Sequence, residues 1–178
     1  SPRAPSYCHG PTGDLVERLL EERLNDAFQR SFTPAWDSAV TFHVVLEEID
    51  RQPEGDDFGA DLTWLRESPE VAGLRQRFAA DLVGFLVDDP IRPPKVGGVS
   101  PQLAATGPDP ASGFMVIEVH CALANYCLEH EVGHCLGMHH DAEEPGHAPF
   151  YGHLIRRDSS GPVLARTIMM RSLGQESA

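Results

Sequence analysis

Hydrophobic residues between positions 14 and 31 recur every three or four positions, which is the spacing of an amphipathic helix. Asp14 and Glu17 form a capping-box pattern, so the helix is predicted to begin at Asp14 and to end near Ser31. Its apolar stripe consists of Leu15, Val16, Leu19, Leu20, Leu24, Ala27 and Phe28. The charged residues of the opposite face are most simply solvated: Glu17, Arg18, Glu21, Glu22 and Arg23.

Further along, the hydrophobic pattern changes to a period of two. Apolar residues alternate in Val40–Ile49, which is also rich in β-branched residues, and they alternate again in Phe114–Cys121. Both segments are therefore predicted to be strands. The second strand leads into a helix from about Ala124 to Leu136. The other predicted elements are a short ordered piece at 61–65, a helix that starts at Pro69, a buried strand at 82–87 and, at 96–100, either a short edge strand or a loop.

Helices and strands therefore alternate along the chain, which predicts an α/β fold. A length of 178 residues suits a single domain with a sizeable core, and 16 glycines with 15 prolines indicate long loops. The proline-rich residues 1–12 are predicted to form an extended arm, and residues 13–178 the domain. The sequence carries no information on oligomeric state.

Charge narrows the range of partners. The formal net charge is −13, which disfavours nucleic acids and anionic membranes. There is no run of 18 apolar residues long enough to span a membrane. Because Ser1 rather than Met comes first, the sequence is expected to be a mature chain without its targeting segment.

Four cysteines permit three pairings. Cys127 and Cys135 lie on one predicted helix, about 12 Å apart, which is too far for a disulfide. Two bridges would therefore be Cys8–Cys127 with Cys121–Cys135, or Cys8–Cys135 with Cys121–Cys127. Disulfides would indicate an oxidising, extracellular location, whereas four reduced thiols would fit a cytosolic protein. As a third possibility, the Cys8 thiolate could bind a metal and keep the protein latent.

The sharpest motif is H-E-x-x-H-x-x-G-x-x-H between residues 130 and 140. His130 and His134 are four apart, so on a helix their imidazoles share one face. Gly137 can end that helix with a positive φ and turn the chain, which brings His140 back. Three imidazoles hold Zn2+ and leave a fourth position open, as in catalytic zinc sites. His139 is the alternative third ligand.

Glu131 lies next to a ligand but off the ligand face, so it is the candidate general base and general acid. Zinc lowers the pKa of water towards about 7, and a nearby carboxylate can take its proton. The alternatives are a helix with ordinary histidines and a zinc site that does not catalyse.

These residues resemble the motif of the metzincin zinc endopeptidases. Thr167-Ile168-Met169-Met170 matches the family's methionine turn, with Met169 at the position beneath the metal. Several other segments resemble the bacterial reprolysin-like and peptidyl-Asp branch, namely residues 74–83, 97–99, 121–125, 151–153 and 166–169. This family has a tyrosine in some branches where the chain has Arg171, and a strand before its first helix that is not predicted here.

The resemblance implies a twisted, mixed sheet with a backing helix and an active-site helix, above a small irregular C-terminal subdomain. The upper part would be residues 13–137 and the lower part residues 138–178. It also implies a bacterial, secreted protein whose substrate is a protein or peptide.

Two sets of residues are candidates for substrate binding. Gly97, Gly98 and Val99 are candidates for an edge strand along which a peptide lies. The family's specificity pocket is walled by the segment before the methionine turn, which here contains Arg156, Arg157 and Arg166. Arginine pairs bidentately with carboxylates, so Arg156 or Arg166 is predicted to select Asp or Glu after the scissile bond. Solvated arginines are the simpler alternative.

The sequence thus favours a zinc-dependent endopeptidase. One alternative is a zinc-containing module that binds peptides without cleaving them. Another is a metal-dependent amidase acting on a small molecule, which would have no use for an edge strand.

Overall fold

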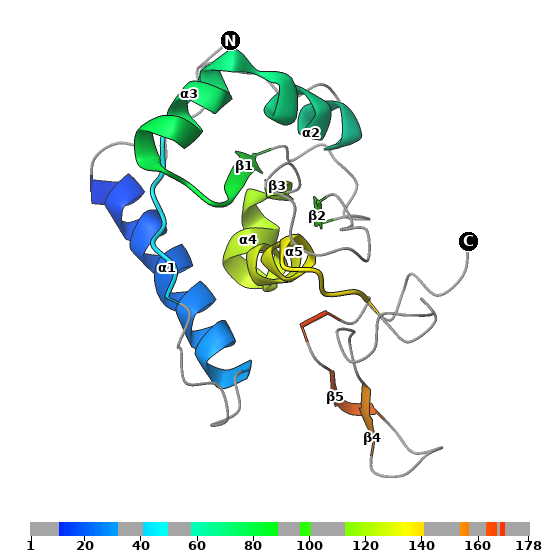
Figure 1. Ribbon diagram of the computed structural model, residues 1–178. Helices are drawn as coiled ribbons and strands as arrows, with labels where there is room; N and C mark the ends of the chain where they lie inside the picture. The colour runs from blue at the N-terminus through cyan, green and yellow to red at the C-terminus, as the bar shows by residue number, and fades with distance from the viewer. Residues whose placement is uncertain are drawn as a thin grey trace.

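The computed structural model describes residues 11–31, 41–49, 58–88, 97–100, 113–140, 154–156, 163–166 and 168–169. The elements in chain order are α1 (Pro11–Ser31), α2 (Phe58–Glu67), α3 (Pro69–Phe78), β1 (Val83–Val87), β2 (Gly98–Val99), β3 (Phe114–Glu118), α4 (Val119–Ala124), α5 (Cys127–Cys135), β4 (Leu154–Arg156) and β5 (Val163–Arg166). The structure is mixed α/β, as the sequence predicts (Figure 1).

Three strands form a sheet of order β1-β3-β2. β1 is parallel to β3, with Val83 opposite Phe114, and β2 is antiparallel to β3, with Gly98 opposite Ile117. Within the described residues β2 is therefore an edge strand, and the predicted strand at 96–100 is confirmed in shorter form. β4 and β5 pair separately as an antiparallel ribbon.

Strand β3 is covered on both faces, because its side chains enter two apolar clusters in turn. Met115 and Ile117 pack with α1, α4 and α5, whereas Phe114 and Val116 pack with α2, α3 and β1. All four side chains are buried. The parallel pair β1–β3 is thus a central layer with helices on both sides, which is the usual setting of parallel strands.

The predicted helix at Pro69 is confirmed as α3. Ser68 Oγ accepts a hydrogen bond from the N–H of Val71, Pro69 occupies the first turn, and Ala79 ends the helix with φ 49°. The segment at 61–65, whose type the sequence left open, lies within helix α2. The predicted buried strand at 82–87 is β1, which begins one residue later.

Helix α1 begins at Pro11, before the predicted start at Asp14, so the last two residues of the predicted arm 1–12 are helical. Residues 1–10 lie outside the described residues, and so does Cys8. The side chain of Glu17 does not complete a capping box, because it accepts a hydrogen bond from a different part of the chain.

The prediction of a strand at 40–49 is wrong for residues 41–49, which join no sheet. They run alongside α1 (cyan in Figure 1), and helix side chains accept hydrogen bonds from alternate N–H groups. Side chains four residues apart on a helix are separated by about 6 Å along its axis. Alternate residues of an extended chain are separated by about 6.6 Å, so the two spacings nearly match. The bonds, each 2.8 Å long, are Phe42 to Asn25, Val44 to Glu21 and Leu46 to Glu17.

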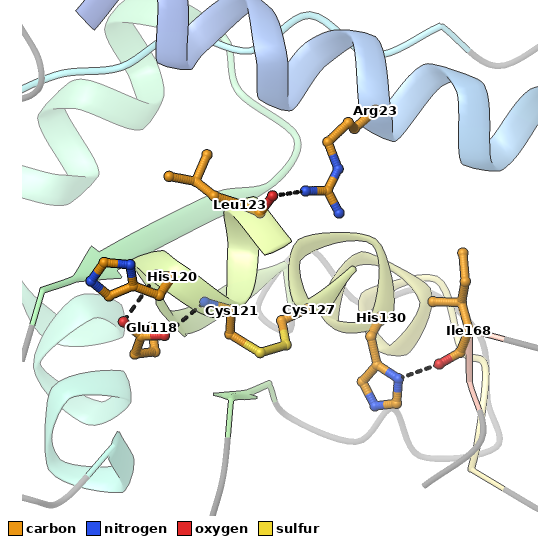
Figure 2. Close-up of a disulfide and its surroundings, with 8 residues drawn as sticks. All are labelled: Arg23, Glu118, His120, Cys121, Leu123, Cys127, His130 and Ile168. Carbon is orange, nitrogen blue, oxygen red and sulfur yellow. Dashed lines mark hydrogen bonds between the residues drawn. A yellow bond between two sulfur atoms is a disulfide. The ribbon is translucent and has the colours of Figure 1, made fainter. Parts of the chain in front are cut away.

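The predicted solvated face of α1 is correspondingly wrong in part. Besides the two acidic residues that hold the extended segment, Arg23 faces the start of the predicted metal-binding helix. Its guanidinium donates to the carbonyl of Leu123 (Figure 2). It also lies 3.3 Å from Glu129 Oε1 and covers the ring of Tyr126. The pair that remains exposed is Arg18 and Glu22.

No helix among the described residues is long and apolar enough to cross a membrane. The proposed division of the chain at residue 137 and its organisation as one domain stay predictions.

Candidate metal centre

The helix that carries the zinc motif is shorter than predicted. Strand β3 ends at Glu118, whose side chain accepts hydrogen bonds from the N–H groups of His120 and Cys121 and caps α4 (Figure 2). The chain then breaks at Tyr126, with φ 59°, before α5 begins at Cys127. The single helix predicted from Ala124 to Leu136 is thus interrupted, because a non-glycine residue with positive φ cannot continue an α-helix.

His130 and His134 project from one face of α5, and His140 joins them from the segment after the helix. Their Nε2 atoms lie 3.0 Å from one another in all three pairs. These three residues form the group in the described part of the chain that could hold a metal ion. His139 is buried and does not belong to that group. His140 as the third ligand stays a prediction.

Backbone carbonyls fix the orientation of two of the three rings. Nδ1–H of His130 donates to the carbonyl of Ile168, and Nδ1–H of His134 donates to the carbonyl of Met138, both at 2.8 Å. Since a carbonyl can only accept, Nδ1 carries the proton in each ring and Nε2 keeps its lone pair. Such partners set the tautomer and the direction of metal-binding histidines.

This arrangement fits a metal ion. Two lone pairs that face each other cannot hydrogen-bond, so Nε2 atoms of His130 and His134 at 3.0 Å need a shared cation between them. Imidazole nitrogens arranged tetrahedrally about zinc at roughly 2.0–2.1 Å lie a little over 3 Å apart. Burial of the ring, and then the charge of His130, lower the pKa of His134 to about 4, so it is neutral at pH 7.

The turn after α5 depends on Gly137, which has φ 89°. Its N–H donates to the carbonyl of His134, and the N–H of Met138 donates to the carbonyl of Gly133. These bonds satisfy carbonyls at the end of the helix, while the positive φ redirects the chain towards His140. The predicted role of the glycine as a helix terminator is confirmed.

Glu131 is buried between α5 and the edge strand β2. Its Oε2 accepts a hydrogen bond of 2.7 Å from Ser100 Oγ, and a Cβ on Gly98 would lie 2.8 Å from its Cγ. Burial raises the pKa of Glu131 to about 7, and the hydrogen bond from Ser100 acts in the opposite direction. The carboxyl group is therefore close to the balance between its two protonation states at neutral pH, which suits a group that takes and returns a proton.

Met169 lies in the turn at residues 168–169 and is buried against α5. A Cβ on Gly133 would be 2.4 Å from its Sδ, so the glycine inside the H-E-x-x-H motif is what lets the methionine approach. The same turn supplies the Ile168 carbonyl that holds His130. Its predicted location beneath a bound metal stays a prediction.

Neither proposed pair of disulfides is correct as a whole, and only the Cys121–Cys127 bridge of the second pair is confirmed. Cys121 is bonded to Cys127 across the break between α4 and α5, with a Cα separation of 5.4 Å (Figure 2). Cys135 is free and buried, so neither Cys121–Cys135 nor Cys8–Cys135 forms. Burial, with a contribution from Glu131, raises the pKa of the Cys135 thiol to about 12, which keeps it protonated.

The disulfide lies against the candidate edge strand. A Cβ on Gly97 would be 2.3 Å from Cys121 Sγ and 2.6 Å from Cys127 Sγ, so only a glycine fits there. Gly97 and Gly98 thus allow β2 to contact the disulfide and Glu131 in turn, and Val99 follows as its last residue.

The candidate specificity residues lie on the two-stranded ribbon. Arg156 is the last residue of β4 and pairs with Val163, while Arg166 is the last residue of β5 and pairs with Leu154. The backbone thus places both arginines on adjacent strands. Arg157 lies outside the described residues.

Sequence reasoning missed Ser100, Gly133 and the two carbonyls that orient the histidines. Gly133 had a signal, because a glycine inside a helix is unfavourable unless something packs against it. Ser100 had none, since its partner is 31 positions away along the chain.

The three-histidine group fits a zinc protease, and one comparison points the same way. A comparison with curated proteins finds one described as "Peptidyl-Asp metalloendopeptidase", from Stenotrophomonas maltophilia (strain R551-3), 26% identical over 137 residues. The match covers 73% of this chain but 31% of that protein, so the chain spans about a third of its relative. No family model matches, and no solved structure matches.

Proposed function

We propose that this protein is a zinc-dependent endopeptidase of the metzincin class. The observation that carries the proposal is the convergence of the Nε2 atoms of three histidines, two of which flank Glu131 on helix α5. In this reading His130, His134 and His140 hold Zn2+, and Met169 supports the site from the far side of Gly133. The disulfide and the bacterial relative support a secreted bacterial protein.

Zinc held by three imidazoles supplies Lewis acidity, which polarises a carbonyl group and makes water more acidic. Glu131 accepts a proton from the attacking water and then donates it to the amine nitrogen that leaves. Its burial between α5 and β2 limits contact with bulk solvent, so that the proton returns to the leaving group.

In this proposal the peptide is held by β2, which is one of the two edges of the three-stranded sheet among the described residues. An extended peptide adds to such an edge through its own backbone groups, with little dependence on side chains. The absence of a Cβ at Gly98 lets this edge lie against Glu131, so a peptide added to it would run near the general base. An edge of this kind favours peptides over small amides as substrates.

Substitution of the base tests the proposal. Glu131→Gln is expected to retain zinc and to lower casein turnover by roughly 10²–10⁴-fold, because the proton acceptor is removed while the ligands remain. A chelator should abolish turnover by the unmodified protein. Metal analysis and a casein assay measure both effects, with Glu22→Gln on the exposed face of α1 as the matched control.

Near-normal turnover by Glu131→Gln would remove Glu131 from the mechanism. If the unmodified, zinc-loaded protein binds casein but does not cleave it, the protein is a peptide-binding module instead.

Cleavage specificity is the second part of the proposal. The relative is named a peptidyl-Asp enzyme, and Arg156 and Arg166 lie on paired strands. We expect cleavage before Asp or Glu, since a guanidinium binds a carboxylate through two parallel hydrogen bonds. Cleavage-site profiling of a digested proteome should show that acidic preference, and Arg156→Ala or Arg166→Ala should lower it about tenfold or more.

The matched control is Arg66→Ala, which removes an exposed arginine of α2. A profile dominated by apolar residues, or one unchanged in both ribbon variants, would contradict the assignment.

A further inference from the structure

The side chain of Ser100 donates a hydrogen bond to the carboxylate of Glu131. The Oγ···Oε2 distance is 2.7 Å, which is the ordinary length of a well-formed hydrogen bond from a hydroxyl. Ser100 immediately follows β2, whereas Glu131 is on α5. The bond therefore ties the edge strand to the helix that carries the three-histidine group.

Gly98 is the second close neighbour of the Glu131 side chain. A Cβ at this position would lie 2.9 Å from Oε1 and 3.1 Å from Cδ of Glu131, so the carboxylate rests on the glycine backbone. With Oε2 bound to Ser100 and the carbon atoms against Gly98, the carboxylate has little room to rotate. Glu131 is only 5% exposed, and a buried carboxylate in contact with a hydroxyl keeps a fixed orientation.

A glutamate side chain has several rotamers, and only some of them place an oxygen where a proton can be exchanged. The bond to Ser100 uses Oε2 and leaves Oε1 for the proton. Within the described residues, no hydrogen bond to Oε1 competes with that use. Ser100 can thus fix which oxygen reacts without touching the substrate.

We infer that Ser100 is a positioning residue for Glu131, and that its hydroxyl holds the general base in the orientation needed for proton transfer. This inference rests on the proposed peptidase function. It assigns Ser100 an effect on the rate of the chemical step and not on zinc binding, because its hydroxyl bonds to Glu131, whereas His130 and His134 are held by the carbonyls of Ile168 and Met138.

The test compares Ser100→Ala with Ser100→Thr, which keeps the hydroxyl. Ser100→Ala is expected to lower kcat roughly 10–100-fold with KM and zinc content unchanged, because misplacement of a catalytic group by about 1 Å can cost that much. Ser100→Thr should restore most of kcat. The matched control is Ser68→Ala, which removes another buried hydroxyl that caps α3, and should lower the melting temperature without changing kcat in the folded protein.

A second readout does not depend on turnover. The visible absorption of the Co2+-loaded protein reports the surroundings of the metal, and it should change in Ser100→Ala in the same direction as in Glu131→Gln but not in Ser100→Thr. If the unmodified protein cleaves casein and Ser100→Ala retains full kcat, the inference is overturned. If the unmodified protein cleaves nothing, the proposed function fails, and the cobalt spectrum alone decides: a spectrum unchanged in Ser100→Ala overturns the positioning role, and a changed one supports it.

Discussion

Single glycines decide the geometry of this site. Gly97 admits the disulfide, Gly98 admits the carboxylate of Glu131 and Gly133 admits the sulfur of Met169, each at a distance that a Cβ would not allow. Gly137 serves differently, since its φ of 89° turns the chain towards His140. Three of these positions are limited by space and one by backbone conformation, so an alanine would act differently at each.

Gly137→Ala is expected to lower the free energy of unfolding by about 1–2 kcal/mol, because an alanine with positive φ is strained. It should also weaken zinc binding, since relief of that strain moves His140. The control is Gly73→Ala on α3, where a Cβ would meet nothing within 4 Å; it should stabilise the protein by about 0.5–1 kcal/mol. Urea unfolding and zinc titration measure both variants, and equal stability of the two would contradict the role of φ.

At the scale of elements, residues 41–49 are extended but bind to helix α1, whereas a strand would pair with other strands in a sheet. Its hydrogen bonds come from side chains, which can follow an extended backbone because the repeats of helix and extended chain nearly match. Phe42, Val44 and Leu46 then pack on the apolar cluster that also contains β3 and α5. The period-two pattern was therefore interpreted correctly as extended chain and wrongly as sheet.

Glu21→Ala should destabilise the protein by about 1–2 kcal/mol, because the half-buried N–H of Val44 loses its acceptor. Glu21→Gln keeps an acceptor oxygen and is expected to lose less. Glu22→Ala, one position along the same helix but on the exposed face, is the control and should change stability by less than about 0.5 kcal/mol. Thermal unfolding of the three variants provides the comparison, and equal effects of Glu21→Ala and Glu22→Ala would show that the bond contributes nothing.

For the whole molecule, the three-histidine group and its supports join segments that are distant in sequence. His130 and His134 belong to α5, His140 follows it, and the Ile168 carbonyl comes from the turn that precedes the C-terminal tail. A metal ion bound to this group is linked to the folding of α5 and of the turn that orients it. Zinc should therefore act on the stability of the molecule as well as on its chemistry.

Zinc is expected to raise the melting temperature, with a gain of about 2.7 kcal/mol at a free concentration one hundred times its Kd. A chelator should reverse the gain, and His134→Ala should abolish it because one of the three ligands is lost. His43→Ala is the control, as His43 is an exposed histidine outside the group. Calorimetry with and without zinc measures the shift; an equal shift in His134→Ala would place the bound ion elsewhere.

The sequence by itself determined what depends on local spacing. Histidines four apart share a helix face, a glycine ends that helix, and runs of apolar residues form β1 and β3, since each of these follows from backbone geometry within a few residues. The identity of the three histidines that meet was predictable for the same reason. Ser68 and Pro69 likewise marked the start of α3 through their own local chemistry.

The tertiary structure decided everything that depends on partners far apart in the chain. It chose Cys127 as the partner of Cys121 and paired the extended residues 41–49 with helix α1 instead of a sheet. It also supplied the Ile168 carbonyl that sets the tautomer of His130. It also brought the hydroxyl of Ser100 to Glu131. None of these contacts has a periodic signature, because each is fixed by how separate elements pack and not by the repeat of any one element.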